Sequence, residues 1–128
     1  MSEYPYASPL TIFRDHCERG ELAYQVRGDS GAPVFHPRMV SPGTAEPDLE
    51  WRTSTGTGRV YATTTIHPRK GEPYDVSLID LDEGFRMMAR VEGLAPDAVR
   101  IGLRVRVRMH RDTPDGAPYP VFVPLEEV

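Results

Sequence analysis

Alternating apolar and basic residues from position 101 to position 109 constrain the fold more than any other feature of the chain. The segment reads Ile-Gly-Leu-Arg-Val-Arg-Val-Arg-Met, and a period of two is typical of a β-strand with one buried face. Four more short segments have β-strand character, and they are 60–66, 74–81, 85–91 and 119–123. A helical or turn insert, 94–99, separates the third segment from the fourth. Five short strands arranged in this way predict a small Greek-key barrel of the OB type.

The first 22 residues contain one predicted helix. Ser8 is its candidate N-cap, Pro9 fits its first turn, and Gly20 is a natural stop. One face of this helix is apolar and consists of Leu10, Phe13 and Cys17. A helix of this length is marginal alone, so we expect it to pack on its own domain or on a partner.

Residues 23–50 are rich in chain breakers, with seven glycines and prolines that forbid a long element. We expect two small hairpins or knuckles joined by turns. The charge also changes along the chain, because residues 1–51 hold four arginines against eight acidic residues, whereas the remainder holds eleven of each sign. The chain is therefore predicted to be mainly β, with a helical segment at 1–22, a small hairpin segment at 23–50 and a barrel domain at 51–128.

Composition excludes several classes of protein. The chain has 128 residues, a net charge of −4 and 39% hydrophobic residues, which fits a globular domain with a short appendage. Its one cysteine excludes an internal disulfide and every metal site built on several thiolates. No apolar run is long enough to span a membrane, and the N-terminus lacks a basic and an apolar signal region. We therefore expect a cytoplasmic protein without a membrane partner.

Pieces spread through nearly the whole chain resemble one family. They are Phe13 to Leu22, Tyr24-Gln25, Pro37-Arg38, Ser41-Pro42, Asp48 to Trp51, Gly56 to Tyr61, Ile66-His67, Tyr74 to Gly84, Ile101-Gly102 with Val105, and Pro120 to Pro124. In their order and spacing they resemble the zinc-ribbon and OB-fold proteins catalogued as domain of unknown function 35. The resemblance implies a rubredoxin-like ribbon before a five-stranded OB barrel. It also implies an acyl-CoA-associated partner of thiolases and related enzymes.

The chain departs from this family at the ribbon. The resemblance places the four zinc-binding cysteines of the family at Arg27, Ser30, Ser41 and Thr44, and none of these is a cysteine here. Arginine cannot bind zinc, and neutral hydroxyls are poor substitutes for thiolates. We therefore expect a degenerate ribbon with no zinc and no other cofactor. Either local packing replaces the metal or a partner orders the segment.

Three arginines of the alternating strand, Arg104, Arg106 and Arg108, share one face. We favour a solvated outer face that pairs with acids on neighbouring strands. The alternative is an anion-binding stripe for a CoA phosphate, an acidic partner or nucleic acid. His67, at a strand end beside Pro68, is the remaining candidate for a ligand cleft, although we favour an exposed strand end as its explanation.

No catalytic constellation is visible. Cys17 is best explained as a small apolar residue, the four histidines have no metal spacing, and Asp80, Asp82 and Glu83 fit a hairpin turn. Our first hypothesis is a non-catalytic accessory subunit of a thiolase-, ketosynthase- or acyltransferase-like enzyme, which helps to form its acyl-CoA channel.

Two other hypotheses remain open. The first is a single-stranded nucleic-acid-binding OB protein that uses the arginine face with Trp51, Tyr61 and Phe85, which the net charge of −4 opposes. The second is a stand-alone enzyme that uses His67 or His110.

Overall fold

The computed structural model describes residues 8–28, 30–35 and 49–125, and its first element is the predicted helix. Helix α1 spans Pro9–Glu18. The hydroxyl of Ser8 accepts a hydrogen bond from the backbone N–H of Thr11 at 3.2 Å, and Pro9 occupies the first turn. After the helix, Gly20 adopts a φ of 78°, which favours glycine. The capping residues read from the sequence are therefore confirmed.

A three-stranded antiparallel sheet follows, in the order β2-β1-β3. Strand β1 (Ala23–Arg27) is central, with β2 (Pro33–Val34) and β3 (Leu49–Thr53) on its two sides. Four of the five β1 residues are buried. Trp51 lies inside β3 and pairs with Gln25, so the chain passes from this sheet to the next through residues 54–56.

The second sheet has five antiparallel strands in the order β6-β5-β4-β7-β8. Its elements are β4 (Thr57–Ile66), β5 (Tyr74–Leu81), β6 (Arg86–Ala89), the 3₁₀ helix η1 (Pro96–Ala98), β7 (Arg104–His110) and β8 (Tyr119–Pro124). The five strands and the insert after the third confirm the predicted OB fold.

The barrel closes just beyond the end of β6. Val91 forms a parallel bridge with Phe122 of β8. The backbone N–H of Phe122 donates to the carbonyl of Arg90 at 2.9 Å, and that of Glu92 donates to the carbonyl of Phe122 at 2.7 Å. These two hydrogen bonds join the edges of the sheet into a cylinder.

A glycine in β4 allows its close contact with β5. A β-carbon at Gly58 would lie 2.3 Å from the backbone carbonyl oxygen of Asp80, so no other residue fits without a shift of the backbone. Two residues further on, the register with β5 shifts between Val60 and Ala62. Such a bulge bends a strand and strengthens its twist, as closure of a small barrel requires.

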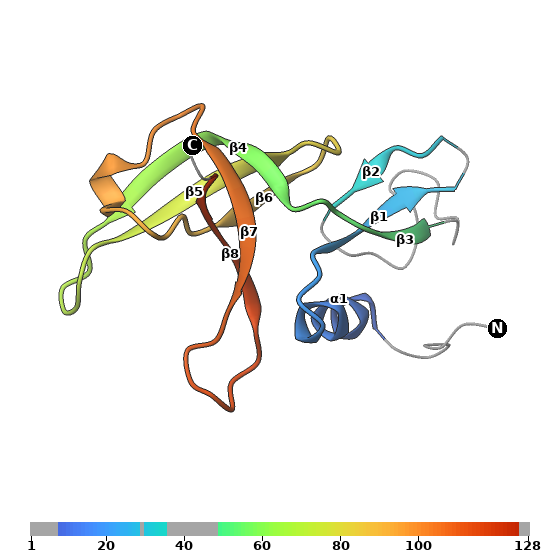
Figure 1. Ribbon diagram of the computed structural model, residues 1–128, viewed down its shortest axis with the longest axis horizontal. Helices are drawn as coiled ribbons and strands as arrows, with labels where there is room; N and C mark the ends of the chain where they lie inside the picture. Colours follow the sequence, from blue (N-terminus) through green and yellow to red (C-terminus); the bar gives the residue numbers. More distant parts are fainter. Residues whose placement is uncertain (1–7, 29, 36–48, 126–128) are drawn as a thin grey trace.

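One hydrophobic core joins the two sheets. Leu22, Tyr24 and Val26 of the first sheet belong to the same buried cluster as the barrel residues. Phe85, just before β6, stacks on the rings of both Tyr24 (centroids 4.7 Å apart) and Phe35 (5.1 Å). In Figure 1, helix α1 and the small sheet lie together beside the barrel. No helix in the described ranges is long and apolar enough to cross a bilayer.

Candidate functional site

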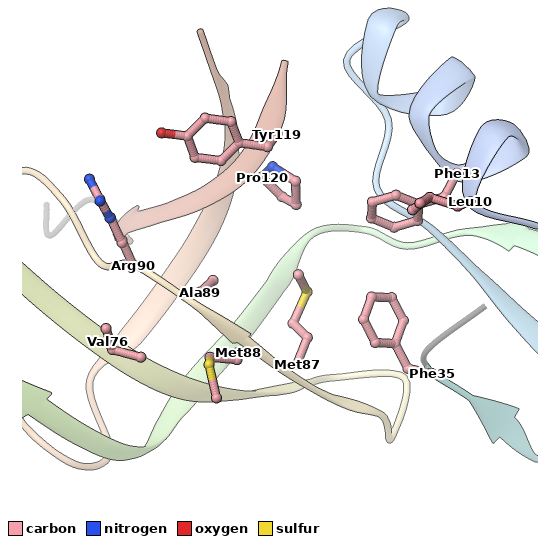
Figure 2. Close-up of a pocket in the computed structure, with 10 residues that line it drawn as sticks. All are labelled: Leu10, Phe13, Phe35, Val76, Met87, Met88, Ala89, Arg90, Tyr119 and Pro120. Carbon is pink, nitrogen blue, oxygen red and sulfur yellow. The ribbon is translucent and has the colours of Figure 1, made fainter. Parts of the chain in front are cut away.

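A half-open apolar trough of about 450 Å³ lies between helix α1 and the barrel (Figure 2). Its ten lining residues are Leu10, Phe13, Phe35, Val76, Met87, Met88, Ala89, Arg90, Tyr119 and Pro120. This volume lies in the range of ligand and anchor pockets, which is about 300–1,000 Å³. Because α1, the end of β2, β6 and β8 all contribute, the trough exists only where the two parts of the chain meet.

The side of the trough formed by α1 is aromatic and aliphatic. Phe13 meets Phe35 edge to face, with ring centroids 5.8 Å apart. Leu10 is 48% exposed, and Met88 across the trough is 64% exposed. Exposed apolar side chains beside a hollow are typical of a surface that another molecule covers, and methionine adapts to varied shapes.

Polar groups lie at the other end of the trough. The Tyr119 hydroxyl donates to the Asp112 carboxylate at 2.9 Å, and the Tyr119 ring packs edge-on against His110. Burial, with Asp112 as a second cause, raises the pKa of Tyr119, so the phenol keeps its proton at neutral pH. The guanidinium of Arg90 lies over the Tyr74 ring, 4.7 Å from its centroid. In the described part of the chain, no carboxylate pairs with Arg90.

A buried carboxylate fixes the segment that carries Arg90. Asp75 of β5 is 2% exposed and accepts hydrogen bonds from the hydroxyls of Thr63 (2.5 Å) and Ser77 (2.7 Å). It also accepts one from the backbone N–H of Val91 at 2.9 Å. The sequence analysis missed this role, although strand parity places Asp75 on the inward face of β5 together with Ser77.

Acids on neighbouring segments pair with two of the three arginines of the alternating strand. Arg104 donates two hydrogen bonds to Asp82, at 2.8 and 3.0 Å, and Arg108 donates one to Glu92 at 2.6 Å. The hydrogen bonds from Arg104 and Thr57 lower the pKa of Asp82 to about 2. Arg106 is exposed, and the described residues supply no acid for it. The anion-binding stripe therefore stays a prediction, now centred on Arg106.

His67 lies apart from these arginines. It lines a second, smaller cavity of about 170 Å³ with Thr65, Pro73, Pro96 and Asp97. Strand β7 pairs only with residues 57–59 of β4, whereas His67 follows the far end of that ten-residue strand. The structure therefore does not gather His67 and the arginines into one site.

The aromatic residues considered for nucleic-acid stacking are not a platform. Phe85 is 5% exposed in the core, and Trp51 stacks with His16. Only Tyr61 is well exposed, and the guanidinium of Arg86 covers its ring at 3.5 Å. Nothing in this arrangement favours single-stranded nucleic acid as a ligand.

The remaining candidates have structural surroundings. Cys17 is buried, and burial together with the charge of Glu18 raises the pKa of its thiol to about 11, so it stays protonated at neutral pH. Glu83 accepts hydrogen bonds from the Ser54 hydroxyl (2.7 Å) and the Thr55 backbone (2.8 Å). Burial opposes the charge of Glu83, but these hydrogen bonds outweigh it and its pKa lies below the ordinary value.

The proposed zinc positions are only partly within the described residues. Arg27 ends β1 and closes a turn through its carbonyl, which accepts a hydrogen bond from the Gly31 N–H at 2.7 Å. The Ser30 hydroxyl accepts a hydrogen bond from the Ala32 N–H at 3.2 Å. Ser41 and Thr44 lie outside the described ranges. In the ranges that are described, no three His, Cys, Asp or Glu side chains group as metal ligands do, and the metal-free ribbon stays a prediction.

Known proteins are similar to this chain in sequence and in fold. The family model for the C-terminal OB-fold domain of ChsH2 matches residues 51–110. A probable enoyl-CoA hydratase alpha subunit of Thermomonospora curvata is 36% identical over 88 residues, which are 62% of this chain and 27% of that protein. A DUF35 domain-containing scaffold protein of Methanocaldococcus jannaschii is 33% identical over 92 residues, 67% of this chain and 65% of that protein. The chain thus matches only part of each relative, about a quarter of the hydratase subunit.

Two solved structures resemble most of the chain. One is the Ltp2-ChsH2(DUF35) aldolase, with a TM-score of 0.80 and 26% identity over 94% of this chain and 97% of that one. A DUF35 protein of Sulfolobus solfataricus shares the fold, with a TM-score of 0.61 and 15% identity over 81% of each chain. In its match to the ChsH2 barrel, to the scaffold protein of Methanocaldococcus jannaschii and to the aldolase structure, this chain resembles the DUF35 family of OB-fold proteins in sequence and in fold.

Proposed function

We propose that this chain is a non-catalytic subunit of an enzyme that processes acyl-CoA thioesters. The observation that carries the proposal is the match to the aldolase structure, because it covers 94% of this chain and 97% of that one. The relatives named as a hydratase alpha subunit and as a scaffold protein support the same kind of role.

The side chains support a holding role better than a reactive one. The thiol of Cys17 is buried and protonated, and hydrogen bonds engage the carboxylates of Asp82 and Glu83. The apolar trough is open and rimmed by Leu10 and Met88. A subunit of this kind contributes by fixing the shape of its partner's active site and by excluding water, while the partner supplies the reactive groups.

The class of partner enzyme is a finer part of the proposal. The family resemblance favours a thiolase-, ketosynthase- or acyltransferase-like partner, whereas the related proteins are named for a hydratase and an aldolase. The hydratase relatives are named for CoA thioesters, and we propose that this chain helps to bound the channel that receives an acyl-CoA. Arg106, exposed and without an acid in the described residues, is available for a CoA phosphate.

Co-expression tests the proposal. The chain is expressed with each acyl-CoA enzyme encoded beside its gene, with an affinity tag on one member only, and the eluate is analysed for stoichiometry and for turnover of acyl-CoA. We expect one enzyme to co-purify at a fixed ratio and to lose activity or stability without this chain. Turnover by the isolated chain, or failure of every such enzyme to associate, contradicts the proposal.

A further inference from the structure

Among the residues that the structure describes, strand β6 has a free edge. It pairs with β5 on one side and stands at the end of the sheet. The N–H of Leu81 donates to the carbonyl of Phe85 at 2.8 Å, which fixes the parity of the ladder. Hydrogen-bonded pairs alternate with non-hydrogen-bonded pairs in an antiparallel ladder. Met87 and Ala89 therefore direct their backbone groups towards β5, and Arg86 and Met88 direct theirs away from it.

Pro120 is the residue at which β8 stops pairing with the extension of β6. β8 pairs with the extension of β6 through Phe122, whose N–H donates to the carbonyl of Arg90. If the parallel ladder continued, its next donor would be two residues earlier on β8, at position 120, and that residue is proline. Proline has no N–H to donate, and no backbone hydrogen bond joins Met88 to β8 in the described part of the chain.

The trough runs along this open edge. Met87, Met88, Ala89 and Arg90 line it consecutively, and Pro120 and the residues of α1 form the opposite side (Figure 2). An exposed strand edge with apolar surroundings is a template for pairing with another chain. A strand added to such an edge gains affinity from main-chain hydrogen bonds and specificity from pockets for alternate side chains.

The arginines beside this edge indicate which kind of strand can pair with β6. On this side of the barrel, Arg86 pairs with Asp80, whereas no described carboxylate pairs with Arg90. If two copies of β6 paired about Met88 in antiparallel fashion, Arg86 of one copy would face Arg90 of the other. Like charges directly opposite each other destabilise a sheet. A second copy of this chain is therefore a poorer occupant than a partner segment that carries a carboxylate.

We propose that the free edge of β6 accepts an extended segment of the partner enzyme, which adds one strand to the barrel. The segment places apolar side chains in the trough and an aspartate or glutamate against Arg90. This inference rests on the proposed function, because the occupant belongs to the acyl-CoA enzyme. To the proposed function it adds the surface that binds the enzyme, which is the β6 edge, and the way the enzyme is bound, which is by an added strand.

A matched pair of substitutions at one position tests the backbone contact. Met88→Ala removes the side chain and keeps the N–H, whereas Met88→Pro also removes the N–H, which β5 does not use. We expect Met88→Pro to bind the co-purifying enzyme about fivefold to tenfold more weakly than Met88→Ala, since one hydrogen bond is lost. Thermal melting checks that both variants fold. Equal affinities of the two folded variants overturn the added strand.

Photo-cross-linking tests the occupant without reliance on folding of the proline variant. A benzophenone amino acid replaces Met88, and the control carries it at Ile101, which is 72% exposed in the turn before β7. We expect a cross-link from position 88 to an apolar partner peptide that contains an acidic residue, and none from position 101. A cross-link from position 88 to this chain itself, or none from it in an intact complex, overturns the inference.

The two proposals fail in different ways. If the wild-type chain holds no acyl-CoA enzyme, the proposed function fails before any variant is compared. If the complex forms and Arg90→Glu binds as tightly as the control Arg100→Glu, which reverses another exposed charge beyond η1, then only the edge inference fails.

Discussion

The buried carboxylate of Asp75 accepts a hydrogen bond from the backbone N–H of Val91 at 2.9 Å. Val91 forms the parallel bridge with Phe122 that closes the barrel, and its neighbour Arg90 lines the apolar trough. One inward-facing acid on β5 therefore supports both closure of the barrel and the position of the cation beside the trough.

Replacement of Asp75 by alanine is expected to lower the free energy of unfolding by about 3 kcal/mol, because the buried donors of Val91, Thr63 and Ser77 lose their acceptor. Urea denaturation followed by circular dichroism measures the loss. The control is Asp115→Ala, an exposed acid, for which a change within about 0.5 kcal/mol is expected. Similar midpoints for the two variants would show that the network contributes little.

Replacement of Phe85 by alanine is expected to destabilise the chain by about 3–5 kcal/mol, since a buried aromatic ring is removed. The ring stacks on Tyr24 and Phe35, so its loss also loosens the contact between the small sheet and the barrel. Phe85→Leu retains apolar volume and is expected to cost less. Hydrogen exchange of β1 amides, compared with β4 amides, shows whether the small sheet detaches first.

Gly58→Ala is expected to destabilise the barrel more than Gly102→Ala does. The new β-carbon at position 58 would meet the Asp80 carbonyl at 2.3 Å, and the backbone must move by enough to cost about 1–3 kcal/mol. Gly102 has a φ of 90° but open space around it, so only the conformational penalty of about 1 kcal/mol applies. Thermal unfolding of the two variants side by side gives the order.

Acid is expected to weaken the pairing of Asp82 with Arg104. The pKa of Asp82 in the folded chain is about 2, below the ordinary value of 3.8. Its contribution to stability is therefore complete above pH 4 and is lost as the pH falls towards 2. Arg104→Gln should raise this pKa towards 3.8 and flatten the pH dependence of unfolding in that window. An NMR titration of the Asp82 carboxyl that is unchanged by the substitution would contradict the assignment.

Cys17 is expected to be unreactive in the folded chain. Burial raises the pKa of its thiol to about 11, so almost no thiolate exists at pH 8. A disulfide reagent such as DTNB should therefore react with the native protein far more slowly than with the chain in urea. A fast reaction in native buffer would show that α1 opens readily.

The sequence predicted those elements whose signals are local. Period-two alternation located the barrel strands, and Ser8 with Gly20 located the ends of α1. The division near residue 51 follows a change in charge, whereas Trp51 itself lies within β3. Pairing of β3 with β1 depends on residues far apart in the chain, which the local charge does not report.

The trough could not be predicted from the sequence. It needs Leu10 of the helix and Met88 of the barrel on facing walls, and no local pattern relates two residues so distant in the chain. The arginine face and its pairing with nearby acids were predicted, but the individual acids were not, because Asp82 and Glu92 come from a turn and from the extension of β6. Strand parity alone would have placed Asp75 inside the barrel.

Pro120 has one further consequence. An ordinary amino acid at this position would offer Met88 the missing donor and extend the seam of the cylinder by one rung towards the hairpin. The barrel would then be closed over a longer stretch of β6, and less of this edge would be available to a partner strand. In the proposed mode of attachment, the imino acid at position 120 thus keeps a binding edge open.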